Sequence, residues 1–190
     1  MIDKAERHPD DAYMSPSWAV QLALDHIPLR SEGTILEPCA GTGNFVRALR
    51  ERYPNRGIRA LDINPAFAPS LRQWTPVVEV ADFRQWAIAY RREMGAKVGP
   101  GLIITNPPFS IAREILDAAF LVATPTTQIV MLLRLSFLES EARKAWWQNH
   151  PVDAVYALSK RPSFTGDGKT LGQAFGFFVW RGLEKGVYVL

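Results

Sequence analysis

The stretch Leu36–Phe45, LEPCAGTGNF, decides the fold of this chain. It continues an apolar segment, turns through Gly41 and Gly43, and enters a helix near Asn44. Glycines permit a tight turn and a close approach of the backbone to a ligand. The unpaired N–H groups of the first helical turn point toward the same place. A strand, a glycine turn and a helix in this order predict the first unit of an α/β sheet.

The rest of the chain repeats this alternation of short apolar strands and amphipathic helices. Strands that are apolar throughout and are separated by helices indicate a parallel sheet covered on both faces. We therefore predict a doubly wound α/β fold. The expected strands span residues 34–38, 57–62, 76–82, 101–106, 127–133, 152–158 and 174–180, with 186–190 as a further strand beside them. The expected helices span residues 17–27, 44–53, 83–93, 110–122 and 139–149.

Length and composition predict one ordinary globular domain over residues 1–190. Of the 190 residues 47% are hydrophobic and 22% charged, and the formal charge is only +3. Cys39 is the single cysteine, which excludes an internal disulfide framework and a zinc cluster. The polar N-terminus and the lack of a long apolar run predict a cytoplasmic protein without a membrane segment. The arginine-rich run 44–59 is interpreted mainly as solvated helix surface.

The glycine turn does not match a dinucleotide fingerprint. Val46 stands where the third glycine of that fingerprint would lie, three residues after Gly43. Glu37 would place negative charge beside a pyrophosphate, so it suits a ligand with a cationic amino group better. A glycine turn that serves the structure alone is the alternative.

Acidic residues also end the second and third predicted strands. Asp62 follows the glycine turn by about 20 residues, the spacing at which an acid accepts both hydroxyls of a ribose. Asp82 is suited to an adenine amino group, and Phe83 to covering the adenine ring. Both acids have a second interpretation, as a turn residue or helix cap for Asp62 and as the N-cap of the next helix for Asp82.

The fourth predicted strand ends in Asn106–Ser110, NPPFS. Asn106 offers a side-chain carbonyl oxygen, and Pro107 offers a backbone carbonyl on a stiff elbow. Two such acceptors can hold an amino group through both of its hydrogens and make its nitrogen more nucleophilic. Phe109 offers a face for a planar base. The motif therefore favours an exocyclic amino group on an aromatic ring as the acceptor.

With these motifs, the chain resembles the S-adenosylmethionine-dependent amino methyltransferases, particularly the small, phage-type N6-adenine DNA methyltransferases. EPCAGTG resembles their cofactor motif, and Asn106-Pro107-Pro108-Phe109 resembles their catalytic motif. Tyr13-Met14-Ser15-Pro16 resembles the element that closes over the methionine end of the cofactor. The resemblance implies a catalytic set and a cofactor-binding set. The catalytic set is Asn106, Pro107, Pro108 and Phe109. The cofactor-binding set is Tyr13, Ser15, Pro16, Glu37, Pro38, Cys39, Ala40, Gly41, Gly43, Asp62, Ile63, Asp82, Phe83 and Asn106.

The resemblance further implies a Rossmann-like class I fold, with seven strands and the last one antiparallel. It implies S-adenosylmethionine as cofactor, no metal, and direct methyl transfer to the N6 amino group of a DNA adenine, flipped out of the stack in a duplex. No cysteine nucleophile is needed, and Cys39 is interpreted as a small apolar residue of the cofactor loop. A prokaryotic or phage-encoded protein is expected.

The later half suggests how substrate is held. Arg161 and Phe164 resemble the segment with which phage-type enzymes reach their target, and Phe164 is predicted to stack on the base. Arg161 and Lys169 are predicted to touch substrate, with Lys160 also near phosphates. A surface hairpin without a binding role is the alternative.

Because the core sheet uses every later segment, no separate target-recognition domain is expected, and specificity should be short or absent. Adenine in RNA and a protein glutamine side chain remain alternative substrates. A non-catalytic partner subunit that binds cofactor or DNA remains a further alternative.

Overall fold

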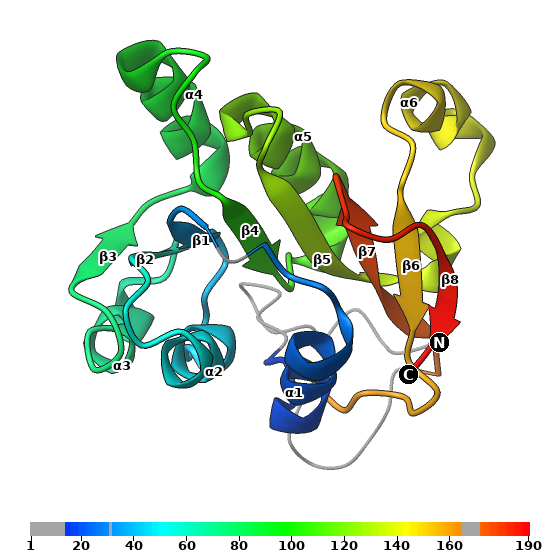
Figure 1. Cartoon of the computed structure of the whole chain (residues 1–190), viewed down its shortest axis with the longest axis horizontal. Coiled ribbons are helices and arrows are strands. Elements are labelled where there is room, and N and C mark those ends of the chain that lie inside the picture. Colours follow the sequence, from blue (N-terminus) through cyan, green and yellow to red (C-terminus); the bar gives the residue numbers. More distant parts are fainter. Residues whose placement is uncertain (1–13, 31, 165–171) are drawn as a thin grey trace.

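The computed structural model describes residues 14–30, 32–164 and 172–190. Its strands form one eight-stranded sheet in the order β3-β2-β1-β4-β5-β7-β6-β8 (Figure 1). The predicted strands are confirmed to within a few residues at each end. The bounds are β1 Ile35–Glu37, β2 Ile58–Asp62, β3 Val77–Val80, β4 Leu102–Thr105, β5 Gln128–Arg134, β6 Ala154–Ala157, β7 Phe175–Trp180 and β8 Gly186–Val189.

The sheet is parallel except for β7, which runs antiparallel to both of its neighbours, β5 and β6. The predicted antiparallel strand is thus confirmed, but the expected total of seven strands is one too few. β8 adds an eighth strand, parallel to the outer edge of β6. Backbone hydrogen bonds at both ends of β8, from Gly186 to Asp153 and from Leu190 to Ala157, fix it there.

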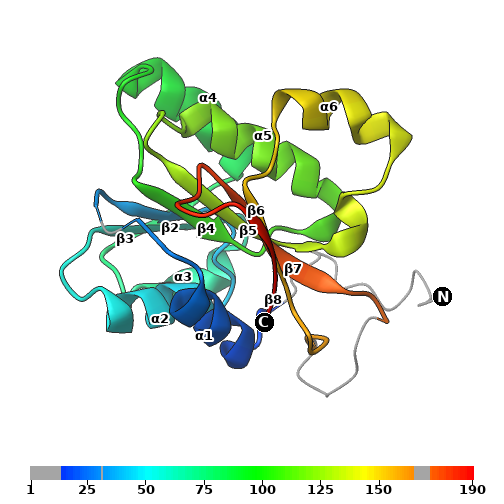
Figure 2. The same ribbon diagram turned by 45° about the vertical axis from the view of Figure 1, so that its right-hand side comes forward.

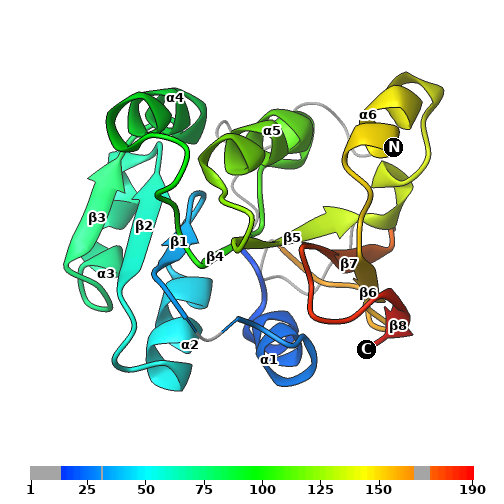
Figure 3. The same cartoon turned by 45° about the horizontal axis from the view of Figure 1, so that its top comes forward.

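Helices cover both faces of the sheet, as predicted (Figures 2 and 3). α1, α2 and the short α3 lie on one face, and α4, α5 and α6 lie on the other. The expected helix over 110–122 begins with a 3-10 turn, η3, before α5 starts. The bounds are α1 Ser17–His26, α2 Asn44–Arg52, α3 Ala68–Leu71, α4 Phe83–Met94, η3 Phe109–Ile111, α5 Ala112–Val122 and α6 Lys144–Asn149. Further 3-10 turns are η2 Pro65–Phe67, η4 Leu135–Phe137 and η5 Glu141–Arg143.

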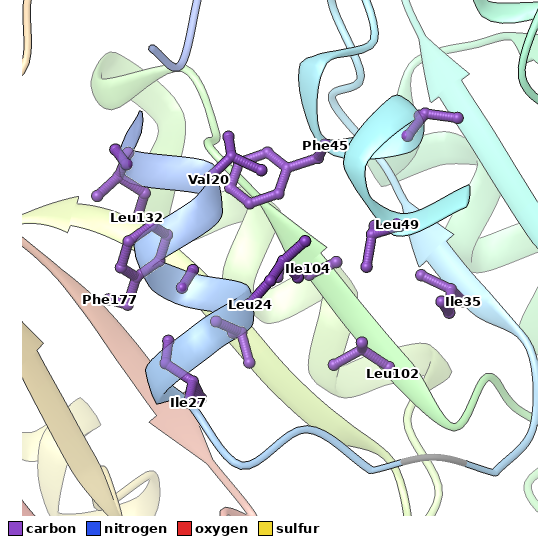
Figure 4. Close-up of a cluster of buried hydrophobic side chains, with 14 of the residues drawn as sticks. Val20, Leu24, Ile27, Ile35, Phe45, Leu49, Leu102, Ile104, Leu132 and Phe177 are labelled. Atoms are coloured by element: carbon purple, nitrogen blue, oxygen red, sulfur yellow. The ribbon is translucent and has the colours of Figure 1, made fainter. Parts of the chain in front are cut away.

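One of two cores lies between the sheet and the helices α1 and α2 (Figure 4). Val20 and Leu24 of α1 meet Phe45 and Leu49 of α2 above the central strands, because these positions recur at helical spacing on one side of each helix. Phe45 also contacts Phe177 of β7 edge to face, with ring centroids 6.3 Å apart. This packing fixes the start of α2, and with it the glycine turn.

The edge strand β3 departs from the predicted apolar burial, since Val77 and Val80 are exposed. The arginine-rich run also differs from a simple solvated surface. Arg50 donates hydrogen bonds to the carbonyl oxygens of three residues, and so does Arg56. These two side chains cross-link loops at the amino-terminal edge of the sheet. Within the described residues, no helix combines the length and apolar character that spanning a bilayer requires.

The strand order reverses between β1 and β4. From β1 the chain proceeds outward to β2 and β3, and it then returns to place β4 on the other side of β1. In such sheets the crevice beyond the carboxyl ends of the strands at this reversal is the usual ligand site. Glu37, at the end of β1, and Asn106, just after β4, both stand there.

Candidate functional site

Two adjoining pockets open at this carboxyl edge, and they share residues of the glycine turn and Asn106. The larger pocket is lined by Met14, Pro38, Cys39, Gly41, Asp62, Ile63, Asn64, Phe67, Ala81, Asp82, Phe83, Arg84, Asn106, Pro108, Ile111 and Ile115. The smaller is lined by Met14, Ser15, Glu37, Cys39, Ala40, Gly41, Thr42, Asn44, Phe45 and Asn106. Most of the predicted cofactor residues therefore surround one continuous site.

The glycine turn adopts a backbone that only glycine accommodates easily. Gly41 and Gly43 have φ angles of 52° and 93°. A β-carbon on Gly43 would lie 3.0 Å from a methyl group of Leu71. Gly43 lines neither pocket, and its role is to end the turn as the residue that precedes α2. Both predicted glycines are thus explained, one as a pocket wall and one as a structural hinge.

Asp62 holds this turn in place from the end of β2. One carboxylate oxygen accepts a hydrogen bond of 2.7 Å from the backbone N–H of Gly41, and the other accepts one of 2.9 Å from Asn64. The carboxylate also lines the larger pocket. Each carboxylate oxygen has two acceptor sites, so bonding to the turn and contact with a ligand are compatible. Both interpretations of Asp62 from the sequence therefore fit one position.

Glu37 is the most unusual group of the site. Its side chain is 2% exposed, and its Oε2 has no hydrogen-bond partner among the residues that the structure describes. Burial, and secondarily the charge of Asp62, raise the pKa of the Glu37 carboxyl well above its ordinary value. A buried polar atom without a partner is costly, so it indicates a missing donor. An ammonium group in the smaller pocket would supply that donor and would hold Glu37 ionised.

Asp82 serves as the N-cap of α4, the second of its two predicted roles. Its carboxylate accepts a hydrogen bond of 2.9 Å from the backbone N–H of Arg84 and forms an ion pair with the Arg84 side chain. The bonds from Arg84 lower the pKa of Asp82. Asp82 nevertheless borders the larger pocket, so the cap does not remove it from reach of a ligand. The neighbouring Phe83 ring is buried, stacks on Trp86, and forms part of the same wall.

The catalytic motif is divided between the pocket and the core. Asn106 is 8% exposed and lines both pockets, and Pro108 lines the larger one. Pro107 borders neither. Phe109 is partly buried, with the rings of Phe164 and Phe175 at centroid distances of 5.4 Å and 5.2 Å.

The predicted substrate residues of the later half are not gathered at the pockets. Phe164 is 3% exposed and packs inside the core against Phe109, so in this conformation it has no face available to a base. Its burial follows from Phe175, whose ring centroid lies 4.9 Å from that of Phe164. Arg161 is exposed at the surface. Lys169 lies outside the described residues.

The element before α1 is described in part. Tyr13 lies outside the described residues. Ser15 lines the smaller pocket, while Pro16 only precedes α1. The side chain of Asn44 donates a hydrogen bond of 2.7 Å to the carbonyl oxygen of Ser15. This bond ties the segment to the start of α2, beside the glycine turn.

Sequence reasoning missed several residues of the pocket wall. Asn64 follows Asp62 by two residues, and Arg84 follows Asp82 by two residues. This proximity to predicted site residues could have identified both. Phe67 belongs to η2, an element that was not predicted. Ile111 is the last residue of η3, and Ile115 of α5 reaches the pocket because α5 packs beside α4. Helical spacing alone gave no signal for them.

The polar side chains around the two pockets are carboxylates, amides, hydroxyls, the Arg84 guanidinium and the Cys39 thiol. Burial, and the nearby Asp62 and Glu37, raise the pKa of Cys39, so its thiol stays protonated and is a poor nucleophile. No histidine of the described residues lines either pocket. No group of three or more metal-ligating side chains occurs within the described ranges. The arrangement suits a reaction between two bound partners, in which the protein mainly positions them.

Comparison with solved structures defines the fold. A predicted O-methyltransferase, Atu636 of Agrobacterium tumefaciens, matches with a TM-score of 0.60 at 16% identity, over 93% of this chain and 84% of that one. Human methyltransferase-like protein 13, in complex with SAH, gives 0.53 at 18% identity, over 84% and 75%. A Pyrococcus horikoshii protein described as an RNA methyltransferase gives 0.58 at 15% identity, over 88% and 84%. The fold is therefore the Rossmann-like fold of the class I methyltransferases.

Comparison of sequences finds a relative that is also a methyltransferase. The type II methyltransferase M.CvrRI of Paramecium bursaria Chlorella virus XZ-6E is 28% identical over 109 residues. The match covers 57% of this chain and 27% of the length of that relative. No protein-family model matches the chain.

Proposed function

We propose that this protein transfers a methyl group from S-adenosylmethionine to the N6 amino group of adenine in DNA. The observation that carries the proposal is the position of Asn106. Its side chain, buried just after β4, borders both pockets and lies beside the turn that Asp62 holds. A methyl acceptor held by Asn106 would therefore sit next to the cofactor pocket.

The residues of the site fit the cofactor on chemical grounds. The unpartnered Glu37 oxygen in the smaller pocket calls for a cationic donor, and S-adenosylmethionine carries an ammonium group. The Asp62 carboxylate in the larger pocket suits the hydroxyls of a ribose. Phe83 and Ile63, with Asp82 beside them, form a wall suited to an adenine ring. When bound, the cofactor supplies an electrophilic methyl group on a sulfonium.

The protein's own part is to bind, orient and exclude water. Asn106 accepts a hydrogen bond from the acceptor amino group, and the Pro107 carbonyl is proposed to accept a second. Two such bonds draw the nitrogen away from planarity. Its lone pair is then less delocalised into the base and can attack the methyl group. Phe109, held by Phe164 and Phe175, then acts as the wall along which a base lies. Direct transfer without a covalent intermediate fits these pockets, because none of their described lining residues is an activated nucleophile.

The viral relative, a type II methyltransferase, favours DNA as the substrate class, and the match covers 57% of this chain and 27% of that relative. Adenine in RNA is the second candidate, and the Pyrococcus neighbour is the finding that favours it. The burial of Phe164 removes the stacking contact that would have favoured a nucleobase over a glutamine side chain. A protein glutamine is therefore the third candidate substrate.

Mass spectrometry of digested nucleosides and peptides tests the proposal. The protein would be incubated with S-adenosylmethionine and unmethylated duplex DNA, single-stranded DNA, RNA or a glutamine-containing protein extract, and the products digested and analysed. We expect N6-methyladenine from DNA, lost in Asn106→Ala and retained in Asn149→Ala, an asparagine change on the exposed surface of α6. Methyladenine from RNA alone would show that RNA is the substrate. Methylglutamine would show that the methyl acceptor is a protein side chain and not a nucleobase. Cofactor binding with no methylated product would indicate a non-catalytic subunit.

A further inference from the structure

Arg134 ends β5 at the same edge of the sheet as the candidate site. The parallel pairing of β4 and β5 places Thr105 beside Met131. Arg134 lies three residues beyond Met131, just as Pro108 lies three residues beyond Thr105. On its other side Arg134 pairs with Phe175 of β7. The side chain therefore starts from a fixed backbone position beside the NPPF motif.

The guanidinium of Arg134 lies over the ring of Phe109, 4.8 Å from the ring centroid. The same ring contacts Phe164 and Phe175. The Phe109 ring is partly exposed and contacts two aromatic rings and one cation. A cation on an aromatic face is a favourable but modest contact, worth more when water is excluded.

Arg134 differs from the other arginines that lie over aromatic rings. Arg143 lies at the same distance, 4.8 Å, over Phe137, but it donates hydrogen bonds to three backbone carbonyls. Arg181 lies over Phe120 and donates to the Thr124 carbonyl. The remaining cases also have acceptors: Arg56 bonds to loop carbonyls, Arg59 pairs with Glu79, and Arg113 pairs with Asp117.

Arg134 has no such acceptor in the part of the chain that the structure describes. No ion pair or hydrogen bond is formed by its side chain there, and its Nε is buried without a partner. A guanidinium presents five donors in a planar fork that matches the oxygens of a phosphate. A half-buried guanidinium with unused donors, beside a candidate base site, indicates an anion that arrives with the substrate.

We propose that Arg134 binds a backbone phosphate of the nucleic-acid strand that carries the target adenine. The inference rests on the proposed function and extends it, because it names the contact that distinguishes a nucleotide from a neutral glutamine side chain. The Phe109 ring keeps the guanidinium at the edge of the site before substrate binds. A phosphodiester next to the target nucleotide then supplies the acceptor that the chain itself lacks.

Binding of a fluorescein-labelled, adenine-containing single-stranded DNA tests this inference, measured by anisotropy with S-adenosylhomocysteine present over a range of salt concentrations. Arg134→Gln removes the charge and the fork, and Arg134→Lys keeps the charge. The matched control is Arg181→Gln, which also removes an arginine from an aromatic ring but lies at the opposite edge of the sheet. Circular dichroism and thermal unfolding establish that each variant is folded.

We expect Arg134→Gln to weaken binding about tenfold, since one charge-assisted contact is lost. The slope of log affinity against log salt should fall by about 0.7, the value for one phosphate contact on a single strand. Arg134→Lys should recover part of the affinity and most of the slope, and Arg181→Gln should match the wild type. In turnover, Arg134→Gln should raise KM more than it lowers kcat.

Equal affinity and equal salt slope in Arg134→Gln and the wild type would overturn the inference. Binding that depends on Arg134, together with no N6-methyladenine from any nucleic acid, would support the phosphate contact while removing the proposed reaction. Wild-type protein that binds neither DNA nor RNA would exclude both the phosphate contact and the proposed reaction. A loss in Arg181→Gln as large as in Arg134→Gln would show a general charge effect and count against the contact.

Discussion

Replacing Glu37 with glutamine removes the most unusual charge of the site at almost constant volume. The side chain is 2% exposed, and its Oε2 lacks a partner within the described residues. If a cofactor ammonium pairs with it, the variant leaves that ammonium buried without its counter-charge. Breaking a buried ion pair in this way costs about 3–5 kcal/mol. The affinity for S-adenosylmethionine should therefore fall roughly 150-fold to 4,000-fold.

The same carboxyl predicts how binding and stability respond to pH. Because burial raises the pKa of Glu37, cofactor binding to the wild type should strengthen as pH rises through that raised pKa, where the carboxyl ionises more readily. Folding stability without cofactor should move the other way. The unfolded chain loses the Glu37 proton first, at about pH 4.3, so the stability that this group contributes is complete below that pH. It is lost as pH rises through the native pKa.

Isothermal titration calorimetry at several pH values measures the affinity, and thermal unfolding without cofactor measures the stability. Glu37→Gln should show weak binding with no pH dependence from this group, and it should lack the loss of stability with rising pH. Glu51→Gln, a change at an exposed position of α2, is the matched control and should behave as the wild type. An affinity for Glu37→Gln within threefold of the wild type would refute the ammonium assignment.

Three further predictions concern the frame of the site. Asp62→Asn should weaken cofactor binding at least tenfold by calorimetry, because an amide can accept at one atom only; unchanged affinity would remove the ribose role. Gly43→Ala should lower the unfolding free energy by about 1–2 kcal/mol, because alanine is strained in this left-handed backbone conformation. The contact of the new β-carbon with the Leu71 methyl group should lower it further. Gly172→Ala, at φ 66° with no atom within 4 Å, is the control for the backbone part, and equal losses would exclude the contact. Phe164→Ala should cost about 3–5 kcal/mol in denaturant unfolding, as for a core phenylalanine, whereas the exposed Arg161→Ala should stay within about 0.5 kcal/mol; a stable Phe164→Ala that loses only DNA binding would restore the stacking role.

The sequence by itself determined the order of strands and helices, the glycine turn and the position of Asn106 after β4. These features depend on neighbours in the chain: on apolar runs of strand length, on glycines where φ must be positive, and on prolines that end a strand. The parallel α/β class follows from them, since fully buried strands need helices on both faces. Glu37 could also be predicted as a ligand-binding residue, because a carboxylate beside a glycine turn suits a ligand with a cationic amino group.

Only the tertiary structure decided what surrounds these residues. Phe164 faces the core because Phe175 of β7 lies beneath it, and no local pattern distinguishes a buried ring from an exposed one at the end of a strand. Arg134 meets Phe109 only because β5 is the neighbour of β4 in the sheet. The strand at 186–190 was predicted, but its place along the outer edge of β6 depends on contact with that distant segment. Burial and partner choice are set by contacts between segments far apart in sequence, and those contacts exist only once the chain has folded.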